Sequence, residues 1–136
     1  MKLLSLIFYY PLLIFTSAYD FTLCNNDVIL FIDSLFLSPQ PNKQLLIQMQ
    51  GISYKTVSDN NTTMSISVYD IPIFTKNIDL CNYTICPIPD YEPININILE
   101  NNTLGYPSGI EYNFTIESTV GGNKDIFCVN FLFKSV

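Results

Sequence analysis

The stretch IEYNFTIE, residues 110–117, alternates between apolar and polar side chains. Its apolar members are Ile110, Tyr112, Phe114 and Ile116. A period of two is typical of a β-strand that has one face in a hydrophobic core and the other in water. The segment therefore predicts a half-buried strand whose Asn113 side chain points to solvent.

The same period of two recurs at residues 45–49, 64–68, 94–98 and 126–133, and a denser apolar run covers residues 28–37. Clusters of turn-forming residues separate these segments, at residues 38–43, 58–61, 101–109 and 121–124. No long segment has a helical period. We therefore predict an all-β fold, an antiparallel β-sandwich. Its many Phe and Tyr side chains either fill the core tightly or line a cavity between the sheets.

The N-terminus carries one lysine, an apolar run and a Thr-Ser-Ala sequence that ends at Ala18. This order predicts a secretory signal peptide at residues 1–18. Pro11 interrupts the apolar run, which is too short for a comfortable membrane span. The remaining residues 19–136 are enough for one soluble domain with a real core. Five Asn-x-Ser/Thr sequons agree with secretion and predict glycosylation at Asn60, Asn61, Asn82, Asn101 and Asn113.

The composition argues against several functions. The net charge is −6, and the chain contains neither Arg nor His. An acidic chain without Arg repels phosphate backbones, so we expect no nucleic-acid partner. The lack of His removes Ser-His and Cys-His catalysis as well as the commonest nitrogen ligand of zinc, so we expect no metal and no cofactor.

An enzyme that uses paired carboxylates is the rival class. Its candidate residues are Asp70, Asp79, Glu92 and Glu111. They stand next to predicted turns or on a polar strand face, where solvated charges usually lie. We therefore expect a protein that is not an enzyme.

The stretch DLCNYTICPIPD, residues 79–90, holds two of the four cysteines, Cys81 and Cys86. Four residues separate them, whereas a thioredoxin-like redox pair has two and usually lies at a helix N-terminus. Zinc would need four ligands, and Cys24 and Cys128 are the remaining thiols. Structural disulfides are the best interpretation in an exported chain. Three pairings are possible, and the spacing alone does not fix one.

Several motifs follow one another in an order that resembles a known family. They are Cys24, SPQP at residues 38–41, Gly51, DLC at 79–81, CPI at 86–88, PSGIEY at 107–112 and IFCVNFLF at 126–133. In this order and spacing the chain resembles the ML lipid-recognition family. That family includes the Niemann-Pick type C sterol carrier, the phosphatidylglycerol/phosphatidylinositol transfer proteins and the group 2 mite allergens.

The resemblance implies an immunoglobulin-like β-sandwich with an apolar cavity between its two sheets. It also implies the disulfide pairs Cys24–Cys128 and Cys81–Cys86. The function that it implies is that of a monomeric lipid carrier that makes transient contact with membranes. Such a carrier would be secreted or would lie in the endosomal or lysosomal lumen.

The lipid that the resemblance implies depends on the branch of the family. Sterol carriers of this family have a third disulfide, which this four-cysteine chain lacks. The pattern is closer to the phospholipid-transfer branch, which implies phosphatidylglycerol or phosphatidylinositol as the ligand. Sterol transport is the alternative, and a module that presents lipid to a receptor is another.

The resemblance also implies a set of lipid-binding residues: Ile73, Phe74, Leu104, Tyr106 and Phe114. Cavity lining by Phe74 and Tyr106 agrees with the apolar and aromatic walls of large pockets, and the alternative for both residues is ordinary packing. Lys76, two residues beyond Phe74, is a candidate cation for an anionic headgroup. A lone Lys, however, is more often a solvated surface charge.

Overall fold

The computed structural model describes residues 19–40, 44–101, 109–121 and 124–134. The strands in chain order are β1 (Thr22–Leu23), β2 (Leu30–Gln40), β3 (Gln44–Ser53), β4 (Asn61–Val68), β5 (Ile71–Ile78), β6 (Pro93–Glu100), β7 (Glu111–Val120) and β8 (Lys124–Lys134). A short 3-10 helix, η2 (Leu80–Asn82), follows β5. Within these residues no helix is long and apolar enough to cross a membrane. The predicted signal peptide lies outside the described residues and stays a prediction.

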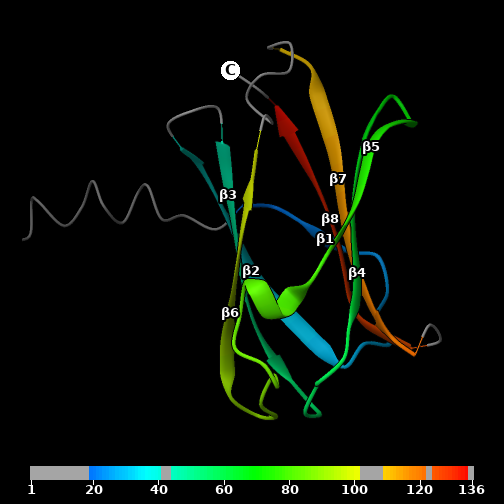
Figure 1. Cartoon of the computed structure of the whole chain (residues 1–136). Helices are drawn as coiled ribbons and strands as arrows, with labels where there is room; N and C mark the ends of the chain where they lie inside the picture. Colours follow the sequence, from blue (N-terminus) through cyan, green and yellow to red (C-terminus); the bar gives the residue numbers. More distant parts are fainter. Residues whose placement is uncertain (1–18, 41–43, 102–108, 122–123, 135–136) are drawn as a thin grey trace, which may run out of the picture.

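The strands form two antiparallel sheets that face each other (Figure 1). The larger sheet has the order β1-β8-β7-β4-β5, and the smaller has the order β2-β3-β6. Each sheet alone would expose one apolar face, so packing these two faces together removes both from water. The predicted all-β sandwich is therefore confirmed.

The core is made by the inner faces of the two sheets, and the alternation in the sequence determines which side chains lie there. In β3 the buried apolar residues are Leu45, Ile47 and Met49, and in β6 they are Ile94, Ile96 and Ile98. In β7 they are Tyr112, Phe114 and Ile116. The predicted faces of these three strands are thus confirmed. In β7, Asn113 stands between Tyr112 and Phe114, which are both buried, so its own side chain lies on the outer face. There its Oδ1 accepts a hydrogen bond from Asn130.

β8 departs from simple alternation, because Ile126 and Cys128 are buried together with the predicted inner residues. At Ile126 the cause is a bulge in β8, because Ser118 of β7 pairs with Phe127 and Thr119 pairs with Asp125, which leaves Ile126 without a partner. Cys128 pairs with the exposed Glu117 on the outer face, and its disulfide to Cys24 covers it. The Ile29 amide also donates to the Asp125 carbonyl at 3.2 Å.

The two long sides of the sandwich are closed by different means. On the side where β2 meets β8, Tyr19 of the N-terminal segment joins the two sheets through its backbone amide and its side-chain hydroxyl. The Tyr19 amide donates to the Leu35 carbonyl of β2 at 2.6 Å, and the Tyr19 hydroxyl donates to the Leu132 carbonyl of β8 at 2.6 Å. The opposite side lies between β5 and β6, which are the edge strands of the two sheets.

Both disulfide pairs are confirmed. Cys24–Cys128 links residues 104 positions apart and ties the start of the domain to its last strand. Cys81–Cys86 closes a loop around η2. The Asp79 side chain caps this helix, because its Oδ1 accepts a hydrogen bond from the Cys81 amide at 3.0 Å.

We expect the two disulfides to differ in their contribution to stability. In the chain-entropy model, a bridge that spans 104 positions contributes between about 4 and 5 kcal/mol, and one that spans 5 contributes about 2 kcal/mol. Denaturant unfolding of Cys24→Ser/Cys128→Ser and Cys81→Ser/Cys86→Ser should therefore rank the first double variant as the less stable. The opposite ranking would contradict the entropic account, and a non-reducing peptide map that joins Cys81 to Cys24 would contradict the pairing.

Gly51 gives a second prediction, because β2 passes too close for any side chain at this position. It pairs with Ile32 beside the bulge in β2, and a Cβ added to it would collide with the Phe31 carbonyl oxygen and lie 3.1 Å from the Ile32 Cα. Gly51→Ala should lower the free energy of unfolding by about 1–3 kcal/mol, since the backbone has to shift. The exposed neighbour Gln50→Ala is the matched control in a thermal melt. Equal melting temperatures for the two variants would refute the argument.

Candidate functional site

β5 presents three side chains toward the space between the sheets: Phe74, Lys76 and Ile78. Each is partly buried, whereas Thr75 and Asn77 between them are exposed. Phe74 pairs with Ile66 of β4 and Lys76 pairs with Met64, and both of these partners are fully buried. Because cross-strand partners share a face of the sheet, Phe74 and Lys76 lie on the inner face.

A β-bulge in the β4–β5 pair determines which β5 residues face inward. The turn between the strands consists of Tyr69 and Asp70, both with positive φ, as expected of a two-residue hairpin turn. The register then shifts between Ile66 and Ser67. This shift leaves Ile73 with an exposed fraction of 47% while Phe74 packs against the core.

β6 brings a carboxylate to the same space. Its buried residues are Ile94, Ile96, Ile98 and Glu100, which follow one another with a period of two. Glu100 pairs with the buried Leu45 of β3, so it too lies on an inner face. Its exposed fraction is 3%. Among the charged residues whose burial the structure describes, Glu100 is the one that is buried.

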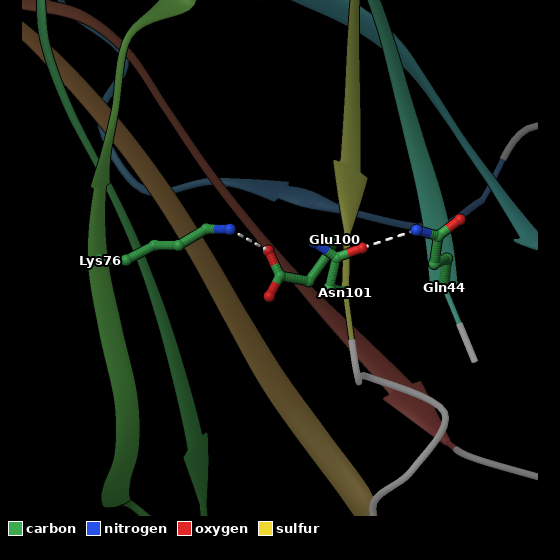
Figure 2. Close-up of polar contacts among 4 residues, drawn as sticks. All are labelled: Gln44, Lys76, Glu100 and Asn101. Atoms are coloured by element: carbon green, nitrogen blue, oxygen red, sulfur yellow. Dashed lines mark hydrogen bonds and ion pairs between the residues drawn. The ribbon is translucent and has the colours of Figure 1, made fainter. Parts of the chain in front are cut away.

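Lys76 and Glu100 form an ion pair that joins the two sheets (Figure 2). The Lys76 Nζ lies 2.7 Å from the Glu100 Oε2. Among the described residues, no hydrogen bond of good geometry reaches this oxygen, so the close contact is electrostatic in character. A Gln44–Asn101 hydrogen bond of 2.7 Å, between β3 and the end of β6, lies close by.

The other part of the β5–β6 side is closed by the segment that follows β5. The Asn97 amide donates to the Tyr83 carbonyl at 3.1 Å, and the Thr84 hydroxyl donates to the Asn95 carbonyl at 2.7 Å. These bonds hold the η2 segment against the free edge of β6. We call the remaining part of this side, which Lys76 and Glu100 span, the mouth.

The sequence-predicted lining residues divide into three groups. Phe74 lies at the mouth, and Phe114 lies deeper, where it stacks on Phe131 with the ring centroids 5.0 Å apart. Both residues pair with Ile66, so they lie in the same row on the inner face of the larger sheet. Ile73 points away from this row, and Leu104 and Tyr106 lie outside the described residues. Whether any of them contacts a ligand stays a prediction.

Glu100 is not among the site residues predicted from the sequence. A signal was present, because Glu100 continues the alternation of Ile94, Ile96 and Ile98 by one further step. A charged residue in phase with an apolar strand face is unusual and indicates a buried ion pair or a polar site. Lys76 is a candidate headgroup cation in the sequence, but without its counter-charge it resembles a solvated surface lysine.

The other ionisable groups form no catalytic arrangement in the described part of the chain. Asp70, Asp79, Glu92 and Glu111 are all exposed, and no group of three or more Cys, Asp or Glu side chains is close enough there to hold a metal ion. Burial raises the pKa of the Tyr112 hydroxyl, which therefore stays neutral at physiological pH.

A hollow of about 590 Å³ lies at the β1–β8 edge of the larger sheet, whereas the mouth lies at the β5 edge. Its lining includes Tyr19, Asp20, Glu111 and Lys134. Burial raises the pKa of the Tyr19 hydroxyl, and the carboxylates of Glu111 and Asp20 add to this shift. The hollow is open to water and lies beside the closed N-terminal side, so the mouth, which borders the apolar inner faces, is the better candidate site.

Comparisons with known proteins agree with this architecture. The crystal structure of a Niemann-Pick type C2 protein from Japanese carpenter ant matches with a TM-score of 0.66 and 13% identity, covering 87% of this chain and 100% of that one. Chicken MD-1 complexed with lipid IVa matches with a TM-score of 0.62 and 10% identity, covering 85% of this chain and 87% of that one. At these identities the two structures support the fold alone.

A family model supplies the assignment. No curated protein matches the sequence. The model described as the ML domain, however, matches residues 18–135, which is nearly the whole chain. The resemblance carried by the cysteine, SPQP and PSGIEY motifs is thereby confirmed, and the chain belongs to the ML-domain family.

Proposed function

We propose that this protein binds a lipid between its two sheets and carries it between membranes. The observation that supports this most directly is the apolar inner surface of an ML domain, reached through a side that ion-paired side chains close. Chicken MD-1, a structural neighbour, was solved in complex with lipid IVa. A binding space of this kind selects for hydrocarbon, because any polar group placed there without a partner loses its hydration.

The physical task of such a carrier is to shield hydrocarbon from water. Each CH₂ group exposed to water costs about 0.8 kcal/mol, so a 16-carbon chain costs on the order of 12 kcal/mol. A protein interior that is nearly as favourable as the bilayer removes most of this cost, and the lipid can then leave at an acceptor membrane. No bond is broken in the process, so no catalytic residue is required.

The inner faces are well packed, which bears on how a lipid would reach them. Met64, Ile66 and Phe114 are fully buried. A ligand therefore has to separate the sheets, and the mouth is the place where this is easiest. There the described residues join β5 to β6 through side chains, whereas the opposite side is held by hydrogen bonds of Tyr19 and Ile29, in a segment that Cys24–Cys128 fixes to β8.

The compartment follows from the cysteines. Two disulfides are typical of proteins that function outside the reducing cytosol. We propose a secreted or lumenal, glycosylated monomer that loses residues 1–18. Phosphatidylglycerol and phosphatidylinositol are the ligands that the resemblance implies, with sterols as the alternative. Mass spectrometry of the lipids that co-purify with the secreted protein identifies the class.

Phe74→Asp tests the position of the site. The carboxylate would face hydrocarbon during lipid passage, so we expect the rate of vesicle-to-vesicle lipid transfer to fall by at least about tenfold. The fold should survive, because Phe74 is only partly buried and a mouth residue can turn its charge toward water. Transfer rate and melting temperature are measured on the same preparation.

The matched control for this experiment is Thr75→Asp, which places the same charge on the exposed outer face of the same strand. It should transfer lipid at the parent rate. If the Phe74→Asp variant does not fold, Phe74 belongs to the core. A folded Phe74→Asp with parental transfer would show that the mouth lies elsewhere. Lipid binding without transfer by the parent protein would favour the role of presenting lipid to a receptor.

A further inference from the structure

The mouth carries two opposite charges where strand alternation places side chains on the inner faces. Lys76 follows Phe74 by two residues on β5, and Glu100 follows Ile98 by two residues on β6. The Lys76 side chain is 31% exposed, whereas that of Glu100 is 4% exposed. The ion pair therefore lies at the boundary between solvent and the apolar interior, with the carboxylate on the buried side.

This pairing makes the mouth unfavourable for an anionic headgroup. A lone lysine would attract a phosphate, but the charge of Lys76 is already balanced by Glu100 at 2.7 Å. A phosphate that took Lys76 from its partner would leave a buried carboxylate without a counter-charge, which is strongly disfavoured. The net charge of −6 and the absence of Arg add to this disadvantage.

A neutral hydroxyl headgroup gains little at this position. A sterol hydroxyl could donate one hydrogen bond to the Glu100 Oε2, for which the described residues provide no hydrogen bond of good geometry. It would leave the Lys76–Glu100 ion pair intact, and this pair spans the side through which the bulky ring system would have to pass. The pair is therefore an obstacle to such a ligand rather than a site for it.

We propose that Lys76 and Glu100 form the headgroup site for a zwitterionic phospholipid, such as phosphatidylcholine or phosphatidylethanolamine. The phosphate pairs with Lys76 on β5 and the ammonium pairs with Glu100 on β6, so each protein charge exchanges one ionic partner for another as the strands separate. In both headgroups two carbons separate the phosphate from the ammonium, so the two charges can pair with side chains on two strand edges that face each other. This inference rests on the proposed carrier function, and it places zwitterionic lipids above phosphatidylglycerol and phosphatidylinositol.

Competition between two headgroups tests the proposal. The secreted protein is incubated with vesicles of equimolar dioleoyl-phosphatidylcholine and dioleoyl-phosphatidylglycerol and then re-isolated. Its bound lipids are extracted and quantified by mass spectrometry. The acyl chains and the membrane surface are common to both lipids, so the ratio of the bound lipids reports on the headgroup. We expect phosphatidylcholine to exceed phosphatidylglycerol by on the order of tenfold.

Three variants assign this ratio to the ion pair. Glu100→Gln removes the buried charge but keeps an oxygen that can accept from Lys76, which becomes free to bind phosphate, so the ratio should fall to about one or below. Lys76→Gln/Glu100→Gln removes both charges and should bind the two lipids about equally. Lys55→Gln changes an exposed lysine beyond the end of β3 and should keep the parental ratio. Melting temperatures establish that each variant is folded.

The outcomes are distinct. A parent protein that binds both lipids equally, or that prefers phosphatidylglycerol, overturns the inference, and so does a parental ratio in Glu100→Gln. If Glu100→Gln does not fold, the same criterion applies to the double variant. In a parallel incubation with vesicles that contain cholesterol, uptake of cholesterol but of neither phospholipid overturns the headgroup site and leaves the carrier function standing. Failure to bind any of the three lipids contradicts the proposed function itself.

Discussion

A carboxylate in an apolar interior is stable only beside a positive charge, and the open side of this sandwich is built around that constraint. The alternation of β6 carries Glu100 onto the inner face, because this residue is in phase with three buried isoleucines. Its counter-charge comes from Lys76 on β5, in the other sheet. Since β5 and β6 are edge strands, the ion pair joins the two sheets where no ladder of backbone hydrogen bonds can.

The remaining connections between the sheets confine any opening to one place. On the β2–β8 side, hydrogen bonds of Tyr19 and Ile29 join the two sheets, and Cys24–Cys128 fixes the segment before β2 to β8. The part of the β5–β6 side next to η2 is held by the Cys81–Cys86 loop, whose residues Tyr83 and Thr84 bond to β6. Separation of the sheets therefore costs least at the mouth, where side chains make the connection. Local opening generally begins where backbone hydrogen bonds are fewest.

Much of the fold could be predicted from the sequence, because strand alternation determines which side chains are buried. The inner faces of β3, β6 and β7 follow the period of two along the chain. The outward position of Ile73 could not be predicted, because a bulge that depends on pairing with β4 shifts its register. The burial of Ile126 could not be predicted either, since it lies at a bulge in β8 that depends on pairing with β7. For the site, the alternation of β6 marks Glu100 as a charge on an inner face, but local spacing does not indicate that its partner is Lys76 in the other sheet.

The position of the ion pair at the boundary of the interior also bears on how a carrier can release its cargo. A fully exposed pair contributes little, between about 0 and 1 kcal/mol, and would hardly hold two sheets together. A fully buried pair could not be broken without leaving unpaired charges in an apolar medium. The Lys76–Glu100 pair has one partner partly exposed and one buried, so a ligand reaches the Lys76 charge from solvent and the Glu100 charge as the strands separate. If one ionic contact replaces another, the protein with and without lipid differ little in electrostatic energy. In the proposed carrier, the balance between bilayer and protein is then governed by hydrocarbon burial, and the lipid both loads and leaves if that burial is nearly as favourable in the protein as in the bilayer.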